Sequence, residues 1–161
     1  MTQLAFSWID KDQVAASDLP VDEADFLWLY EQGIRAIVTL TEDPLQDLLQ
    51  VPSDFYENHG YTLLHAPIKD MGAPKDLNLA YQVANFINKM KAENKPVLVH
   101  CLAGVGRTGM MLHAYYMIQG MSLDDAILKI REAHPMSDFS ELTEVQAKYV
   151  RNLEQSLKEK D

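Results

Sequence analysis

The stretch that decides the fold is Val97-Leu98-Val99-His100-Cys101-Leu102-Ala103-Gly104-Val105-Gly106-Arg107-Thr108-Gly109. Its composition predicts an apolar strand, then a turn with glycines, then the start of a helix. Backbone N–H groups in such a turn and at a helix start point toward one centre, where the helix dipole adds partial positive charge. A cysteine and an arginine separated by five residues across this turn can surround one tetrahedral anion. The stretch therefore predicts a phosphate site.

Cys101 is the only cysteine of the chain. A position just before a helix start favours the thiolate, which is the nucleophilic form of the side chain. A lone cysteine is ordinarily a small buried apolar residue. The flanking glycines, the arginine and the helix start argue against that alternative here. We therefore interpret Cys101 as a cysteine that attacks phosphorus.

The bulk composition is that of one globular domain. The chain has 161 residues, of which 47% are hydrophobic and 24% charged, so we expect a single domain over residues 1–161. The first residues form no basic or long apolar segment, and no apolar run approaches the ~20 residues of a membrane span. A single cysteine excludes an intrachain disulfide framework and suits a reducing compartment. These features predict a cytoplasmic protein.

Acidic side chains dominate the first part of the chain. Residues 1–60 carry 12 acidic and 2 basic side chains, and residues 61–161 carry 12 of each, so the whole net charge of −10 lies in the first 60 residues. An acidic protein of this kind binds nucleic acids and anionic membranes poorly, so we expect neither as a partner. The excess predicts a solvated surface, with a docking face for a basic partner as the alternative.

Strands and helices are expected to alternate along the chain. The strands are expected at residues 4–9, 34–40, 61–66 and 96–100, and the main helices at 22–33, 76–94, 107–120, 122–133 and 140–157. The helix after Arg107 is apolar almost all round, which predicts that it is buried at the centre of the domain. This alternation predicts an α/β fold with a central, mainly parallel sheet flanked by helices. Cys101 follows the carboxyl end of a strand, where such sheets bind ligands.

The string His100-Cys101-x5-Arg107-Thr108-Gly109, with Gly104 and Gly106 inside it, resembles the signature of the cysteine-dependent protein tyrosine and dual-specificity phosphatases. Over nearly its whole length the chain is most similar to the small atypical dual-specificity phosphatases. A bare Cys-x5-Arg is less specific, because sulfurtransferases and arsenate reductases carry relatives of it. The resemblance implies a protein tyrosine phosphatase-like fold and one catalytic domain.

The resemblance also implies roles for the residues of this string. Cys101 is expected to attack phosphorus and form a thiophosphate. The planar fork of Arg107 is expected to hold two phosphoryl oxygens, and the Thr108 hydroxyl to stabilise the departing thiolate. His100 is expected to support the loop through hydrogen bonds. The expected substrate-binding residues are Leu102, Ala103, Gly104, Val105, Gly106 and Arg107.

The leaving group needs a proton donor from another loop. Asp70 is our candidate, because it follows a strand on a loop with Gly72 and Pro74, at the position where the family places its general acid. Asp76 is the second candidate, although its position suits the cap of the following helix. Lys69 stands where family members often have proline.

Hydrolysis of the thiophosphate needs a positioned water, and our candidate for this role is Glu141, by correspondence with a Glu or Gln of relatives. His134-Pro135-Met136 departs from the Arg-Pro-Gly common in the family just before it. The remaining histidines show no spacing of metal ligands. We expect no metal and no cofactor.

The sequence thus predicts a phosphatase that acts on phosphotyrosine in proteins or peptides, with phosphoserine and phosphothreonine left open, and that binds phosphate-like oxyanions. A phosphoinositide or inositol-phosphate phosphatase is the alternative, which Lys69 and Lys75 favour. The apolar Leu102, Ala103 and Val105 disfavour it, because such sites need further cations. A phosphate-binding module without catalysis would lack the nucleophile, the arginine or the acid, and all three are present.

Overall fold

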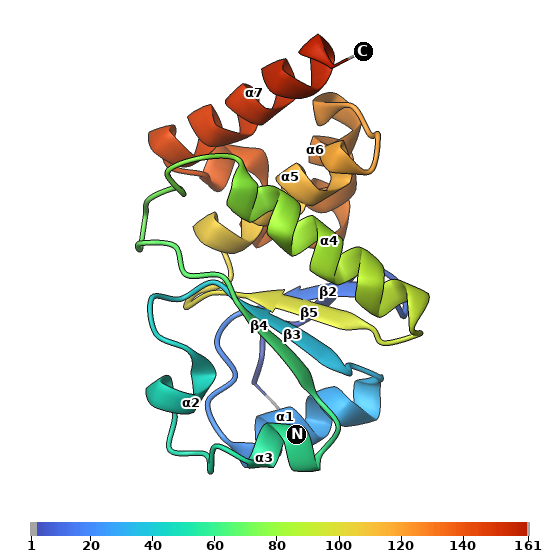
Figure 1. The fold of residues 1–161 in the computed structure, drawn as a ribbon, viewed down its shortest axis with the longest axis vertical. Helices are drawn as coiled ribbons and strands as arrows, with labels where there is room; N and C mark the ends of the chain where they lie inside the picture. The colour runs from blue at the N-terminus through green and yellow to red at the C-terminus, as the bar shows by residue number, and fades with distance from the viewer. Residues whose placement is uncertain (1–2, 161) are drawn as a thin grey trace.

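The computed structural model describes residues 3–160 and contains one five-stranded sheet with helices on both faces (Figure 1). The strand order is β1-β2-β5-β3-β4. Strands β2, β5, β3 and β4 run parallel, and β1 pairs antiparallel with β2. The expected mainly parallel sheet is therefore confirmed. The strands are β1 Ser7–Asp10, β2 Val14–Ser17, β3 Ala36–Thr39, β4 Thr62–His65 and β5 Val97–His100.

The helices form two layers. Below the sheet in Figure 1 lie α1, α2 and α3, and above it lie α4, α5, α6 and α7. The lower layer comprises α1 Glu23–Gln32, α2 Leu45–Leu48 and α3 Phe55–Asn58. The upper layer comprises α4 Asn78–Ala92, α5 Gly106–Ile118, α6 Leu123–Ala133 and α7 Glu144–Glu159, with the 3-10 turns η1 Pro135–Ser137 and η2 Phe139–Glu141 between α6 and α7.

The period-two pattern of the strands divides the core between these layers. On β5, Val97 and Val99 belong to the cluster under α4–α7, whereas Leu98 belongs to the cluster over α1 and α3. The centre of the upper layer is α5, which contacts α4, α6 and α7 and is buried from Arg107 to Met117. The predicted burial of this helix is confirmed, and it fixes the element that follows Cys101.

Local signals set several helix ends as the sequence predicts. The side chain of Asp22 caps α1 by accepting a hydrogen bond from the Asp25 N–H, and Gly33 ends the helix at φ 107°. The hydroxyl of Ser122 accepts from the Asp125 N–H at 3.1 Å at the start of α6. In residues 3–160, no helix has both the length and the apolar character needed to cross a membrane.

Two expected boundaries are wrong. The first strand begins at Ser7 rather than residue 4, and the sequence prediction missed β2, a short buried strand that contains two alanines. The hairpin between β1 and β2 turns at Asp12, whose φ is 63°. The last helix begins at Glu144 rather than residue 140, because Thr143 forms a capping box with Gln146.

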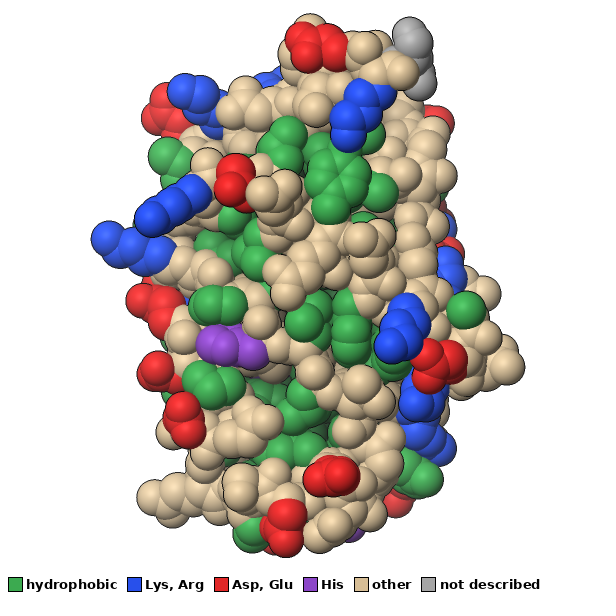
Figure 2. All heavy atoms as spheres, viewed as in Figure 1, with side chains coloured by type: hydrophobic (Ala, Val, Ile, Leu, Met, Phe, Trp, Pro, Cys, Tyr) green, Lys and Arg blue, Asp and Glu red, His purple; other side chains and the backbone are tan. Residues whose placement is uncertain are grey.

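The acidic excess belongs to the part of the chain that forms β1–β3 and the helices below the sheet. Residues 1–60, which carry this excess, contain all of these elements. On the face shown in Figure 2, Asp and Glu side chains lie at the lower end, along the left edge and at the top, and Lys and Arg side chains lie toward the upper end and the right edge.

Candidate active site

The site lies where three parallel strands end together. In the sheet register His100 of β5 pairs with Ser17 of β2 and with Thr39 of β3. Cys101, only 2% exposed, comes directly after β5, and residues 101–106 form a loop, here called the cysteine loop, that leads into α5. The predicted position of Cys101, directly after the carboxyl end of a strand, is confirmed.

Carbonyl groups of the cysteine loop point outward to buried side chains. The Gly104 carbonyl accepts hydrogen bonds from the Ser137 hydroxyl at 2.7 Å and from His134 Nε2 at 3.2 Å. The Ser137 hydroxyl also lies 3.1 Å from the Val105 carbonyl oxygen. His134 is neutral, since burial lowers its pKa, and its Nδ1 accepts from the Ser7 hydroxyl at 2.9 Å. Sequence reasoning gave neither Ser137 nor His134 a role at the site.

The loop N–H groups are left for a ligand. The Leu102 carbonyl accepts from the Leu19 N–H at 2.9 Å, on the side of β2. Within residues 3–160, the N–H groups of residues 102–106 donate to no backbone carbonyl. Buried backbone donors normally have partners, and a nest of them at a helix start binds an anion. The arrangement can therefore surround a tetrahedral oxyanion.

Glycine is required at one position of this loop. Gly104 has φ 76°, and a Cβ there would lie 2.7 Å from the Ser17 carbonyl oxygen. A Cβ on Gly106 would lie 2.6 Å from Oε1 of Gln146, so that side chain would have to move. The two glycines of the sequence motif thus differ in how strictly their surroundings require them.

The Arg107 guanidinium is buried and oriented by three oxygens. Its side chain is 4% exposed. Nη1 donates to the Ile68 carbonyl at 3.0 Å and lies 3.7 Å from Glu42 Oε1, and Nη2 lies 3.4 Å from Asp70 Oδ1. A surface salt-bridge role is excluded by this burial. The position of Glu42 beside Arg107 could not be predicted from the sequence motif.

Thr108 and His100 both form hydrogen bonds with Cys101. The Thr108 hydroxyl donates to Cys101 Sγ at 3.1 Å. Burial lowers the pKa of His100 to about 4, so its ring is neutral. Because a carbonyl only accepts, Nδ1 of His100 donates to the Cys101 carbonyl at 2.9 Å, and Nε2 accepts from the Thr39 hydroxyl at 2.9 Å. His100 thus supports the backbone of the loop.

Asp70 lies on a tight turn that faces the cysteine loop. This acid loop, residues 68–72, is closed by the Gly72 N–H, which donates to the Lys69 carbonyl at 2.8 Å. The Asp70 side chain is 63% exposed and contacts Arg107. The alternative acid, Asp76, accepts from the Asn78 N–H at 2.9 Å, but it lies one residue before Leu77, which is the N-cap of α4.

A cavity of about 270 Å³ joins the two loops. It is lined by Cys101, Arg107, Asp70 and loop residues, and from the segment before and within α7 by Glu141, Thr143 and Gln146. Glu141 is exposed and lies in η2, whereas Gln146 is 1% exposed and lies beside Gly106. Sequence reasoning missed Gln146 and Thr143, although the spacing Thr-x-x-Gln is that of a capping box.

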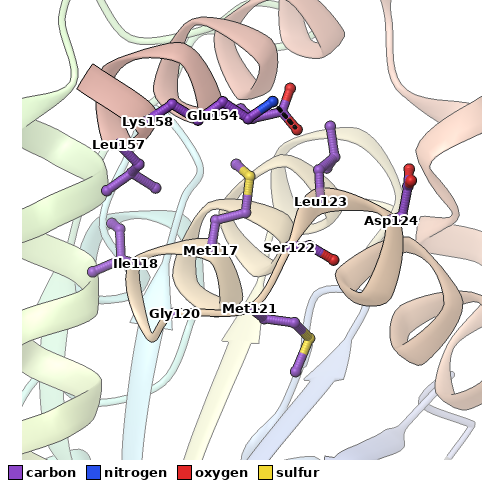
Figure 3. A pocket seen from close by; sticks show the side chains of 10 residues that line it. All are labelled: Met117, Ile118, Gly120, Met121, Ser122, Leu123, Asp124, Glu154, Leu157 and Lys158. Atoms are coloured by element: carbon purple, nitrogen blue, oxygen red, sulfur yellow. Dashed lines mark ion pairs between the residues drawn. The ribbon is translucent and has the colours of Figure 1, made fainter. Parts of the chain in front are cut away.

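A second, larger cavity lies elsewhere. It has a volume of about 510 Å³ and lies between the α5–α6 turn and α7 (Figure 3). Met117, Met121 and Leu157 line it, and the ion pair of Lys158 with Glu154 at 3.7 Å crosses one side. It contains no cysteine, arginine or histidine, so phosphoryl chemistry belongs to the smaller cavity at Cys101.

Comparison with known proteins gives a consistent family. The family model "Polymorphic toxin system, DSP-PTPase phosphatase" matches residues 17–121. Human "Dual specificity protein phosphatase 16" is 39% identical over 85 residues, which are 52% of this chain and 12% of that protein. The Drosophila melanogaster "Dual specificity protein phosphatase Mpk3" is 33% identical over 109 residues, 66% of this chain and 25% of that protein. The matched segments are thus a quarter or less of these two relatives.

Solved structures resemble the chain over nearly its full length. Tk-PTP in its active form has a TM-score of 0.81 and 30% identity, and the match covers 96% of this chain and 99% of that one. PTPMT1 has a TM-score of 0.77 at 21% identity, which shows the shared fold. The chain belongs to the cysteine-dependent protein tyrosine phosphatase superfamily, as a domain of the small atypical dual-specificity phosphatase type.

Proposed function

We propose that this chain is a protein phosphatase that hydrolyses phosphotyrosine through a cysteinyl-phosphate intermediate, within one catalytic domain over residues 1–161. The observation that carries the proposal is the meeting of three groups at one cavity. Cys101 Sγ has a hydroxyl donor at 3.1 Å, Arg107 presents a buried fork, and Asp70 faces both from a second loop. This set supplies a nucleophile, an oxyanion site and an acid.

In the first step the phosphoryl group would bind to the N–H groups of the cysteine loop and to Arg107. Cys101 Sγ forms a bond to phosphorus as the bond from phosphorus to the tyrosine oxygen breaks. Asp70 gives its proton to that oxygen, so the leaving group departs as a neutral phenol. The arginine fork stabilises the charge on the equatorial oxygens, which lysine cannot do with the same geometry.

In the second step a water attacks phosphorus and Asp70, now a carboxylate, accepts its proton. The bond from sulfur to phosphorus breaks, and inorganic phosphate leaves. The Thr108 hydroxyl stabilises the thiolate that reappears, since it already donates to Sγ. Glu141 lines the same cavity and is our candidate for orienting the water, with Gln146 as the more buried neighbour.

The mouth of the cavity suits an aromatic phosphate. Met71 is 67% exposed and Leu102 55% exposed, and both line it, so an aromatic ring would find apolar side chains beside Cys101. Arg107 is the only Lys or Arg among the described residues that line it. A phosphoinositide would bring further phosphates with no cation to receive them, which makes it the less favoured substrate class.

The location and the partners follow from the same features. The reaction requires reduced Cys101, so we propose a reducing compartment, the cytoplasm. The partner is a phosphorylated protein or peptide, and phosphate-like oxyanions such as vanadate would compete for the cysteine loop. The net charge of −10 disfavours nucleic acids and anionic membranes as partners.

The test is a substrate panel with a chelator present: peptides with phosphotyrosine, phosphoserine or phosphothreonine, and phosphoinositides. We expect the highest kcat/KM on phosphotyrosine, no effect of the chelator, and no turnover by Cys101→Ser, which still binds vanadate. A preference for a phosphoinositide would favour the alternative substrate class. Turnover by Cys101→Ser, or loss of wild-type activity with the chelator, would contradict the mechanism.

A further inference from the structure

The turn that carries Asp70 adopts a backbone conformation that needs support. Met71, directly after Asp70, has φ 65°, in the left-handed region that favours glycine. A non-glycine residue persists there only where its surroundings hold it. The Asp70 side chain is mostly exposed, and Arg107 is its only ion-pair partner within residues 3–160. Contacts with the backbone of the turn must therefore keep it closed.

Two side chains at the start of α7 supply such contacts. The Thr143 hydroxyl donates to the Met71 carbonyl at 2.9 Å, and Nε2 of Gln146 donates to the Gly72 carbonyl at 3.1 Å. Each side chain is bonded to the backbone of the other residue, because Oε1 of Gln146 accepts from the Thr143 N–H at 3.1 Å and the Thr143 hydroxyl accepts from the Gln146 N–H at 3.4 Å. The capping box of α7 is thus joined to the two residues that follow the acid.

The Asp70 side chain itself is anchored by Arg107, and substrate changes this contact. Arg107 contacts Asp70 at 3.4 Å as an ion pair. During the reaction Asp70 must carry a proton, and the fork of Arg107 must hold phosphoryl oxygens, so this attraction weakens when the acid is needed. The hydrogen bonds from Thr143 and Gln146 join uncharged groups and are independent of both events.

The same helix start also touches the cysteine loop. Oε1 of Gln146 is the closest atom to a Cβ built on Gly106, at 2.6 Å, and α7 packs along α5. The capping box therefore contacts the loop that carries the acid and the loop that carries the nucleophile. A fixed distance between proton donor and leaving group requires such a common support.

We propose that Thr143 and Gln146 are positioning residues, which hold the acid loop closed and so set Asp70 for proton transfer. This inference rests on the proposed phosphatase reaction. It assigns to the last helix a part in the chemistry that no residue of the Cys-x5-Arg motif supplies.

Thr143→Val is the test, because valine keeps the shape of the side chain and removes its hydroxyl. We expect kcat/KM on phosphotyrosine to fall about fivefold or more, the effect of one hydrogen bond. On nitrophenyl phosphate, whose leaving group departs without a proton, we expect a change of less than about twofold. Vanadate affinity should stay unchanged, and Thr143→Ser should restore the rate. In the Asp70→Asn background, Thr143→Val should have no further effect.

Ser122→Ala is the matched control. It removes the N-cap hydroxyl of α6 in the same way, and Ser122 lines the cavity of Figure 3 rather than the active site. Any loss of helix stability is thereby separated from loss of the contact with Met71. Ser122→Ala should keep both wild-type rates.

Hydrogen exchange separates this inference from the proposed function. Amides of residues 69–72 should exchange faster in Thr143→Val than in wild type or Ser122→Ala, whether or not the protein hydrolyses phosphotyrosine. An inactive wild type with faster exchange in the variant would contradict the proposed function and leave the support of the acid loop standing. Unchanged exchange, or an equal slowing on both substrates, would overturn the role of Thr143.

Discussion

The cysteine loop and the acid loop meet at one cavity but are held in different ways. Carbonyls of the cysteine loop are bound by buried groups, and Gly104 packs against the Ser17 backbone too closely for a Cβ. The acid loop contains a methionine at φ 65° and is held by side chains of Arg107, Thr143 and Gln146. The anion site is therefore built into the core, whereas the acid is placed by contacts at the surface of the cavity.

This difference has a chemical meaning. Oxyanion stabilisation depends on donors that are fixed before the substrate arrives. A general acid must also gain and lose a proton, and Asp70 is open to water for that exchange. The two loops can therefore be disturbed separately, and the variants below are ordered from the largest expected effect to the smallest.

Gly104→Ala should disrupt the cysteine loop and leave the acid loop in place. Its Cβ would lie 2.7 Å from the Ser17 carbonyl oxygen, so the loop must shift and its N–H groups lose their common centre. We expect kcat/KM to fall on the order of a thousandfold on every substrate, as when oxyanion donors are lost. Gly60→Ala is the control, since Gly60 also has a positive φ, 80°, with nothing within 4 Å of a Cβ. Equal effects of the two variants would show that backbone strain alone is responsible.

Asp70→Asn should disturb the acid loop and leave the cysteine loop intact. We expect kcat/KM on phosphotyrosine to fall on the order of a hundredfold, because proton donation is lost, and kcat/KM on nitrophenyl phosphate to change far less. Vanadate binding measured in parallel should remain. A uniform loss on both substrates would mean that Asp70 has a structural role.

Acidification should weaken the support of the cysteine loop through His100. Its pKa is lowered from 6.5 to about 4 by burial, so the unfolded chain takes up the proton first as the pH falls. The contribution of neutral His100 to the free energy of unfolding is fully present above pH 6.5 and is lost progressively down to about pH 4. Between pH 7 and pH 5 the free energy of unfolding should fall by about 2 kcal/mol from His100 alone. Denaturant unfolding at pH 7 and at pH 5 measures this loss of stability. His100→Asn should reduce this pH dependence, and an unchanged dependence would place the titration elsewhere.

The parts of the site also differ in how well the sequence predicts them. The motif from His100 to Gly109 is local, so its strand, turn and helix, and the positions of Cys101, Arg107 and Thr108, could be predicted from residue types and spacing. The partners of the loop come from far along the chain: His134 is 30 residues from Gly104 and 127 from Ser7. Their contacts depend on how the helices pack, which no local pattern contains.

The other features that the sequence analysis missed also depend on contacts between distant parts of the chain. The hydrophobic pattern missed β2 because four residues with two small alanines give little periodic signal, yet the strand is buried between β1 and β5. Thr143 and Gln146 carried a legible capping signal, but their contact with the acid loop joins residues more than 70 positions apart. Glu141, chosen by correspondence with relatives, lines the cavity from η2, and its role stays a prediction.

The most direct test of the account is to trap the covalent intermediate on Cys101. Asp70→Asn is mixed with nitrophenyl phosphate, quenched in acid during the first turnover, and analysed by mass spectrometry of the peptide that contains Cys101. Nitrophenolate leaves without a proton, whereas attack by water needs the carboxylate, so this variant should accumulate one phosphoryl group on Cys101. Release of nitrophenolate with no phosphoryl group on Cys101, or with the group on another residue, would contradict the mechanism.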